Sequence, residues 1–183
     1  MALNIDRIDG QLLELLQEHG RISQHDLARS VGLSAPAVAE RLRKLEDRGL
    51  ISGFTAILDP KRLGLDVTAF IVAGVSGSKH FPDFRAAAEG APEVLECHSV
   101  TGQGSHLLKV RVENTGALER LLAEVQAWPG VEWTQTSIVL STLKETTQLR
   151  VPYPAAETGS GRDGAEETPS PADLLHVPFR HHP

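Results

Sequence analysis

The feature that most constrains this chain is a tight corner between two helical patterns within residues 23–49. The shorter pattern ends at Gly32, a residue type that tolerates the positive φ at which helices often stop. The longer pattern follows Ser34, whose hydroxyl can accept a hydrogen bond from the free amides of a helix start, and Pro36 gives up no helical hydrogen bond in the first turn. Two helices joined so tightly predict a helix-turn-helix, which places its second helix in the major groove of DNA.

A further helix is predicted ahead of this corner, over residues 6–19, with Asp6 as its N-cap. Apolar residues recur at helical spacing in all three patterns, and they predict a shared three-helix core. The core residues are Ile8, Leu12, Leu15, Leu16, Leu27, Val31, Leu33, Val38, Leu42 and Leu45.

The last of these helices carries the candidates for DNA contact. Small Ala37 lets the backbone approach base edges, whereas Arg41 and Lys44 are long enough to reach bases or phosphates. Taken alone, such charges are also typical of an ordinary solvated helix face. The predicted DNA-binding residues are Ser23, Ser34, Ala35, Ala37, Val38, Arg41, Arg43, Lys44 and Arg48, with Arg43 and Arg48 as phosphate contacts.

The charge balance excludes a strongly basic DNA-binding domain. The chain of 183 residues has a net charge of -6, and residues 1–58 carry 7 Lys and Arg against 8 Asp and Glu. Non-specific affinity for DNA comes mainly from neutralised phosphates. One copy is therefore expected to bind weakly, and useful affinity is expected from a local basic cluster that a dimer uses twice on a pseudo-palindromic site.

The second half of the chain repeats a strand–helix–strand pattern. Strands are predicted over residues 67–75, 94–101, 106–112 and 133–143, and helices over residues 82–89 and 116–128. This order is that of the ferredoxin-like βαββαβ fold, so the whole chain is predicted as α+β. Both helices on one face leave the other face of the sheet uncovered, and an uncovered apolar face predicts at least a homodimer.

Several classes of protein are not indicated. No apolar run approaches the length of a membrane helix, and no basic start precedes an apolar stretch, so we expect no signal peptide and a cytoplasmic protein. A single cysteine, Cys97, excludes an intrachain disulfide. Cys97 and His98 are adjacent on a predicted strand and point to opposite faces, so they do not combine with His106 into a metal site. No catalytic constellation or nucleotide fingerprint is present, and no cofactor is expected.

Short motifs follow one another in order between residues 3 and 145. In the first half they are IDRID at 5–9, GRIS at 20–23, LARSVGLS at 27–34, RLRKLE at 41–46, GLI at 49–51 and GFTA at 53–56. In the second half they are ECH at 96–98, VTG at 100–102, LLKV at 107–110 and PGV at 129–131. In these motifs the chain resembles the Lrp/AsnC (feast/famine) family of bacterial and archaeal transcription regulators.

The resemblance implies a division of labour between the two halves. Residues 1–50 would be the helix-turn-helix DNA-binding domain, 51–65 a linker strand and hinge, 66–148 a ferredoxin-like ligand-sensing and oligomerisation domain, and 149–183 a disordered tail rich in Pro, Gly and acidic residues. Family members pair through the second domain into homodimers, and often octamers, and bind double-stranded DNA in that form.

The resemblance also implies an effector site, because small molecules, commonly amino acids, bind between subunits in this family. The implied residues are Thr101, Gly102, Gln103, Gly104 and Ser105 in the loop between the middle strands, with Thr134 and Thr136 on the last strand. Independently, a Gly-rich turn lets backbone amides approach a carboxylate, although a plain hairpin turn has the same composition.

The loop departs from the family pattern at its centre. Many members carry an acidic residue and an aromatic residue there, and the acid can pair with a ligand ammonium. This chain has Gln103, Gly104, Ser105 and His106 instead. The usual acidic position is Ser105, so two alternatives stay open. The effector is an amino acid or a related metabolite, or the site is vestigial and binds none.

Two rival functions remain beside regulation. A chromatin-like DNA-compacting protein would use the same helix-turn-helix without sequence preference, but a near-neutral DNA-binding half argues against it. Proteins similar to this family also serve as tetrapyrrole decarboxylases, with His98 or His106 as an imaginable acid or base. Isolated histidines are weak evidence for catalysis, so the chain is predicted not to be an enzyme.

Overall fold

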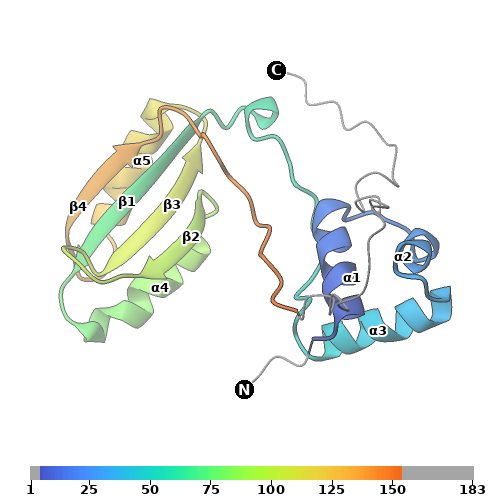
Figure 1. Cartoon of the computed structure of the whole chain (residues 1–183). Coiled ribbons are helices and arrows are strands. Elements are labelled where there is room, and N and C mark those ends of the chain that lie inside the picture. The colour runs from blue at the N-terminus through green and yellow to red at the C-terminus, as the bar shows by residue number, and fades with distance from the viewer. Residues whose placement is uncertain (1–4, 154–183) are drawn as a thin grey trace, which may run out of the picture. The chain divides into compact units, whose positions relative to one another are not determined.

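The structure is a computed structural model that describes residues 5–153. The described residues fall into two compact units (Figure 1). One unit comprises residues 5–56 together with residues 146–153, and the other comprises Ile57–Glu145. Each unit is described by itself.

Three helices make up the N-terminal unit: α1 (Arg7–Glu18), α2 (Gln24–Val31) and α3 (Ala35–Asp47). The predicted N-caps Asp6 and Ser34 are confirmed, and Ser23 caps α2 in the same way. The Asp6 carboxylate accepts a hydrogen bond from the Asp9 amide at 2.8 Å, and the Ser23 and Ser34 hydroxyls accept from the amides three residues on. Gly32 ends α2 in the left-handed region with φ 69°. Local chemistry therefore fixes where each helix begins and where α2 stops.

The three helices share the predicted apolar core. Leu12, Leu27 and Val38, one from each helix, are exposed by 0, 1 and 0%. Partly buried apolar residues surround this centre: Ile8, Leu16, Ile22, Val31, Leu33, Ala35 and Leu42. Packing in the helix core therefore stabilises the turn between α2 and α3, in addition to the left-handed conformation of Gly32.

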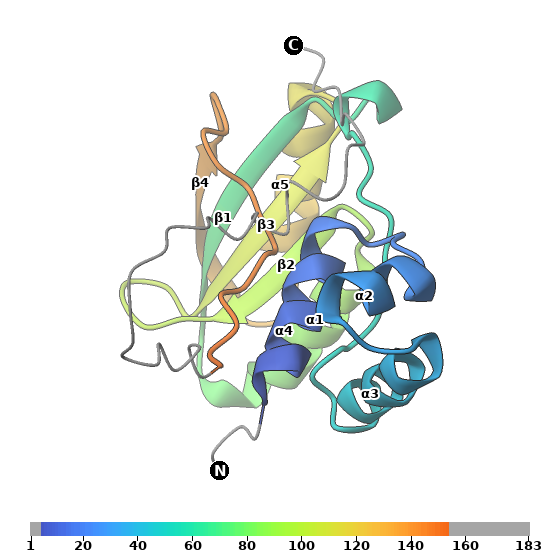
Figure 2. The same cartoon turned by 45° about the vertical axis from the view of Figure 1, so that its right-hand side comes forward.

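A four-stranded sheet with two helices forms the second unit. Its elements are β1 (Val67–Val75), α4 (Phe81–Gly90), β2 (Val94–Ser99), β3 (His106–Val112), α5 (Thr115–Gln126) and β4 (Val131–Ile138), with short 3-10 turns η1 (Lys61–Leu63) and η2 (Ser78–His80). The strand order is β2-β3-β1-β4, and all three pairings are antiparallel (Figure 2). This is the predicted ferredoxin-like arrangement.

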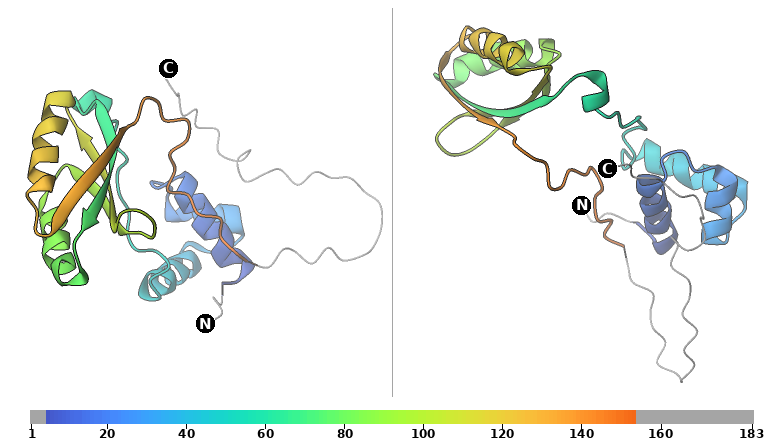
Figure 3. Two further views of the ribbon diagram at one scale, coloured as in Figure 1. Left: turned by 90° about the vertical axis from the view of Figure 1, so that its left-hand side faces the viewer. Right: turned by 90° about the horizontal axis from the view of Figure 1, so that it is seen from above.

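Both helices cover one face of this sheet (Figure 3). Alternate residues of β1 and β3 point toward them, among them Ile71 and Leu108, each 0% exposed, and Phe84 of α4 packs into the same core. The opposite face carries Phe70 and Trp133, which remain 36 and 37% exposed. The expected uncovered sheet face is therefore present in the described chain.

The region between the two units differs from its prediction. Residues 51–58 form no strand, because a strand requires a hydrogen-bonded neighbour and none of the strands in residues 5–153 pairs with them. Phe54 and Ile57 in this segment are 58 and 88% exposed. The last strand also ends at Ile138, five residues before its predicted end at 143.

The C-terminal part of the described chain lies with the N-terminal unit. The sequence predicts a disordered tail from residue 149, but residues 149–153 lie against α1 through contacts of Leu149 and Tyr153. Residues 154–183 of the predicted tail lie outside the described residues. Within residues 5–153, no helix combines the length and the apolar character that crossing a membrane requires.

Candidate DNA-binding and effector sites

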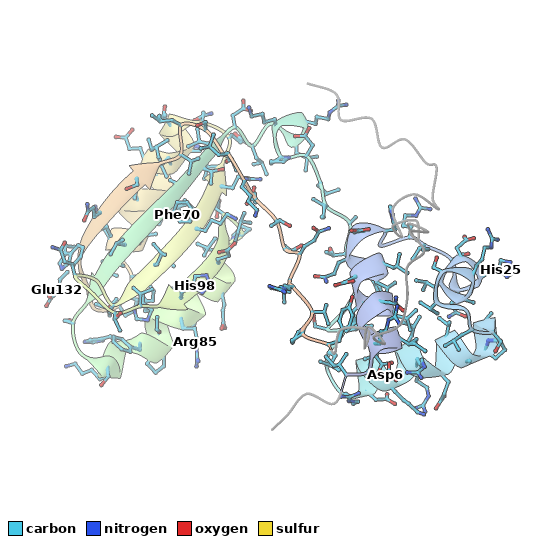
Figure 4. All side chains as sticks on the ribbon, viewed as in Figure 1. Asp6, His25, Phe70, Arg85, His98 and Glu132 are labelled. Atoms are coloured by element: carbon cyan, nitrogen blue, oxygen red, sulfur yellow. The ribbon has the colours of Figure 1, made fainter. Side chains whose placement is uncertain are left out.

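Arg41 lies on the side of α3 that faces α1. Its Nη1 atom donates to Asp6 Oδ2 and to Asp9 Oδ1, both at 2.7 Å, so one guanidinium joins two carboxylates at the start of α1 (Figure 4 labels Asp6). The side chains of Arg41 and Asp9 are only 31 and 12% exposed. Partial burial opposes the ionisation of Asp6, but the Asp9 amide and Arg41 outweigh it and lower the Asp6 pKa. Arg41, which the sequence predicts to contact bases or phosphates, therefore links α3 to α1 in this structure.

The outward face of α3 carries a network of exposed charges. Arg43 donates to Glu40 at 2.9 Å and to Asp47 at 2.6 Å, and Lys44 lies 3.4 Å from Glu40. The hydrogen bond from Arg43 is the main reason that the pKa of Glu40 is lowered. Carboxylates therefore accompany the bases on this face. Phosphate binding would have to displace them, which agrees with the weak binding expected of one copy.

The remaining predicted DNA contacts fall into different environments. Val38 is 0% exposed and packs in the helix core, so the prediction that it contacts DNA is wrong. Helical spacing placed Val38 on the buried side, and this signal takes precedence. Ala35 is partly buried against the same core, whereas Ala37 is partly buried outside it. The exposed residues are Ser23 and Ser34, whose hydroxyls cap helices, and Arg48, the C-cap of α3.

The loop between β2 and β3 divides into an exposed and a buried part. Thr101, Gly102 and Gln103 are exposed, and Gly102 has φ 122°. Gly104 is buried, and a Cβ atom placed there would overlap the Val72 side chain of β1. Close packing against β1 therefore requires a glycine at this position, independently of any ligand.

Ser105 closes the loop onto β1. Its amide donates to the Ala73 carbonyl at 3.0 Å, and its hydroxyl accepts from the Val75 amide at 3.1 Å. The serine at the usual acidic position thus has a structural use here. The hydroxyl also donates to the Ala73 carbonyl at 3.3 Å, and an aspartate would lose this bond because its ionised carboxylate only accepts.

The two threonines of β4 approach this loop from the other side of β1. Thr134 is in register with Ala73 and Thr136 with Ile71, so Thr134 is one strand away from Ser105 at the same end of the sheet. Thr134 also accepts a hydrogen bond from Gln126 of α5 at 3.1 Å. The structure therefore places Thr134 at the same end of the sheet as the loop, with β1 between them, and Thr136 further along the strand.

His106 follows the loop and is 3% exposed. Its ring packs against Phe81 and Phe84 at centroid distances of 4.7 and 4.5 Å, and Nδ1 lies 2.9 Å from the Ser105 hydroxyl. Burial lowers the pKa of His106, which favours the neutral imidazole. His106 therefore belongs to the core beneath the loop.

Two further features are candidates for binding sites: a groove beside β2, and the adjacent residues Cys97 and His98 as metal ligands. A groove of about 540 Å³ lies between α4 and β2 and includes Arg85, Cys97 and His106 in its lining, a feature with no signal in the sequence. Cys97 is in register with Leu108 and His98 with Leu107, so their side chains point to opposite faces. Among residues 5–153, no group of three or more His, Cys, Asp or Glu side chains is placed to hold a metal ion.

Comparison with known proteins finds matches for each half of the chain and for both halves together. A family model described as the Lrp/AsnC ligand binding domain matches residues 68–149, and a winged helix-turn-helix DNA-binding model matches residues 5–52. The HTH-type transcriptional regulator FL11 of Pyrococcus horikoshii is 36% identical over 151 residues, which are 82% of this chain and 99% of that protein. The chain belongs to the Lrp/AsnC family. The leucine-responsive regulatory protein of Escherichia coli K12 is 38% identical over 149 residues, covering 80% of this chain and 91% of its own.

Solved structures of Lrp/AsnC proteins match the same part of the chain. A transcriptional regulator of Neisseria meningitidis in complex with L-methionine aligns with a TM-score of 0.77 and 33% identity, covering 80% of this chain and 96% of its own. A feast or famine regulatory protein of Mycobacterium tuberculosis, also complexed with L-methionine, aligns with a TM-score of 0.75 and 35% identity. This Lrp/AsnC chain is accordingly a transcriptional regulator with a DNA-binding and a ligand-binding domain.

Proposed function

We propose that this Lrp/AsnC protein regulates transcription as a homodimer on a pseudo-palindromic DNA site, with an octamer as its further assembly. The observation that carries the proposal is the sheet face opposite α4 and α5, where Phe70 and Trp133 stay exposed. A second copy of the same face would cover them. Pairing would also supply two α3 helices at once, which compensates for the near-neutral surface of each.

On DNA, α3 of each subunit would enter successive major grooves about 34 Å apart. Ser34 and Ala37 would approach base edges near the start of α3, and Arg43, Lys44 and Arg48 would contact phosphates, with Ser23 at the start of α2. Arg41 would act by holding α3 on α1, in addition to any DNA contact. Glu40, which the sequence predictions omitted, is exposed between Arg43 and Lys44 and could accept a hydrogen bond from a cytosine amino group.

The effector would bind beside the loop of Thr101, Gly102, Gln103, Gly104 and Ser105 and beside Thr134 and Thr136. Relatives whose structures contain L-methionine support an amino acid or a related metabolite as the ligand class. In this chain, backbone amides near Gly102 would hold a carboxylate, and hydroxyl and amide groups would replace the missing acid. The ligand would act only through unequal affinity for two arrangements of the subunits.

Selection of binding sequences from random DNA tests the regulatory role against the compacting one. A regulator returns a defined motif with two related halves, whereas enrichment of no motif would indicate compaction and overturn the proposal. We place the protein in the cytoplasm with its DNA and propose no catalytic activity. Incubation with a tetrapyrrole carboxylate, followed by its absorbance, would reveal turnover if this part of the proposal is wrong.

A panel of amino acids in a thermal-shift assay tests the effector site. A ligand at about one hundred times its dissociation constant stabilises the folded state by about 2.7 kcal/mol. Gln103→Ala and Thr134→Val should abolish the shift caused by an active compound without lowering the melting temperature of the free protein. A shift that persists in both variants would place the ligand elsewhere, with the groove between α4 and β2 as the next region to examine.

A further inference from the structure

The segment after the sheet runs along the outer side of α1. The Gln17 side chain bonds twice to the backbone of Leu149, accepting from its amide at 2.6 Å and donating to its carbonyl at 3.0 Å. Gln148 adds a bond to the Gln17 carbonyl at 3.4 Å. A glutamine amide that satisfies both backbone groups of one residue acts like a neighbouring peptide, so it fixes an extended chain to the helix.

Tyr153 ends this contact at the other end of α1. Its hydroxyl donates to Glu14 Oε2 at 2.7 Å, and its ring lies over Gly10, where an added Cβ atom would overlap the ring. The hydrogen bond with Glu14 is the main reason that the pKa of Tyr153 is raised, and burial adds to it. Both the ring and the hydroxyl of Tyr153 therefore contact α1.

The sequence of α1 fits this contact. Gly10, Glu14 and Gln17 are four and three residues apart, so they form one stripe of the helix, distinct from the core stripe that contains Leu12 and Leu15. Glycine is unfavourable in a helix, yet Gly10 is the fourth residue of α1, where its amide already donates to the Asp6 carbonyl, and it is buried. The glycine is explained by the Tyr153 ring, which lies where the side chain of any other residue at position 10 would be.

The residue just before this segment is anchored elsewhere. Glu145 pairs with Lys109 at 2.5 Å and with Arg111 at 3.7 Å, both on β3 of the sheet. Three residues later, Gln148 already bonds to α1. The chain therefore passes between the helix-turn-helix unit and the sheet unit at two places, after Ala56 and after Glu145.

We propose that residues 148–153 are a strap whose binding site is the Gly10, Glu14 and Gln17 stripe of α1, and that this strap stabilises the helix-turn-helix unit. The occupant is this chain's own segment, fixed by its distance from Glu145. The strap gives the helix-turn-helix unit a second connection to the sheet unit, which is covalent as far as Gln148 and consists of hydrogen bonds and packing from there to α1. Its use in regulation rests on the proposed function, but its binding to α1 does not, and the tests below measure binding to α1 without DNA.

Gly10→Ala in the full chain provides the first test, because alanine has opposite effects with and without the strap. With Tyr153 present, the added methyl group displaces the ring, and the melting temperature should fall. In a Tyr153→Ala background the same change should raise the melting temperature, since alanine is the better helix former. A rise in both backgrounds would overturn the strap.

Gly90→Ala is the matched control, because Gly90 also lies in a helix and nothing is within 4 Å of an added Cβ atom. Its effect on the melting temperature should be the same with and without Tyr153. A sign that changes with Tyr153 for Gly10 but not for Gly90 assigns the interaction to the α1 stripe.

The ionisation of Tyr153 provides a second test of the strap, because Tyr153 is the one tyrosine of the chain. A titration followed by phenolate absorbance therefore measures its pKa alone. Glu14→Gln should lower that pKa toward the ordinary value for tyrosine, since the partner no longer carries a negative charge. An unchanged titration would show that Tyr153 is not seated on Glu14, and it would contradict the strap even if every variant folds.

Discussion

At the scale of single residues, Arg41 holds α1 and α3 together. Replacing it with alanine leaves Asp9, 12% exposed, without a cationic partner. We expect Arg41→Ala to lower the free energy of unfolding by about 1–3 kcal/mol, measured by urea unfolding at neutral pH. Arg29→Ala is the control, because the Arg29 side chain is 72% exposed in its pair with Asp26 and its loss should cost about 0–1 kcal/mol. Lost DNA affinity with unchanged stability would instead make Arg41 a base reader.

The same cluster predicts an acid dependence. Asp6 has a lowered folded pKa against an ordinary value of 3.8, so the unfolded chain binds its proton first as the pH falls. Its stabilising contribution is complete above the ordinary value and is lost as the pH falls through the folded pKa. Arg41→Ala should make the unfolding free energy less dependent on pH in this acid range. An equally steep acid limb in both proteins would count against the Asp6–Arg41 pair.

His106 predicts a second pH window, in the sheet unit. Burial lowers its folded pKa below the ordinary 6.5, so its contribution is complete above 6.5 and is lost as the pH falls from there through the folded pKa. His106→Phe keeps an aromatic ring beside Phe81 and Phe84 and should remove this part of the pH dependence, followed by unfolding between roughly pH 5 and 7. A wild-type slope in His106→Phe would exclude the buried histidine as its source.

At the scale of secondary-structure elements, the turn between α2 and α3 depends on one backbone conformation. Gly32 has φ 69°, and nothing lies within 4 Å of an added Cβ atom, so a substitution there is strained by the backbone alone. Gly32→Ala should therefore lower the unfolding free energy by about 1–2 kcal/mol in thermal or urea unfolding. Gly32→Asn should cost less, because asparagine tolerates the left-handed region. Equal losses would show that the left-handed φ of residue 32 is not the source of the cost.

Elements were predictable where the signal was local. Ser23, Ser34 and Gly32 fixed helix ends through short-range hydrogen bonds and φ, and runs of strand-forming residues predicted β1 and β3 with the residues at which they begin and end. The linker strand was not predictable, because its existence depends on a partner strand. Contacts between distant residues were not predictable for the same reason: only the three-dimensional structure shows that Arg41 bonds to Asp6 and Asp9, that Gly104 packs on Val72 and that Tyr153 covers Gly10.

At the scale of the whole molecule, assembly depends on the uncovered sheet face. Phe70 is 36% exposed in the monomer, so a glutamate at position 70 reaches solvent and should leave the fold intact. In a dimer that buries this face, the same charge is costly. We expect Phe70→Glu to raise the dimer dissociation constant at least about tenfold in analytical ultracentrifugation, equivalent to about 1.4 kcal/mol. Ala123→Glu on the exposed side of α5 is the control and should leave the dimer unchanged.

DNA binding links this assembly to the recognition helices. Two half-sites whose centres are one helical turn apart, about 34 Å, allow both α3 helices of a dimer to bind at once, whereas one half-site allows one. The wild-type protein should prefer the double site strongly in fluorescence anisotropy, and inserting half a turn of DNA between the halves should remove most of that preference. Phe70→Glu should lose the preference while keeping its affinity for a single half-site, because α3 itself is unchanged. A double-site preference that survives this substitution would mean that the subunits pair through another surface.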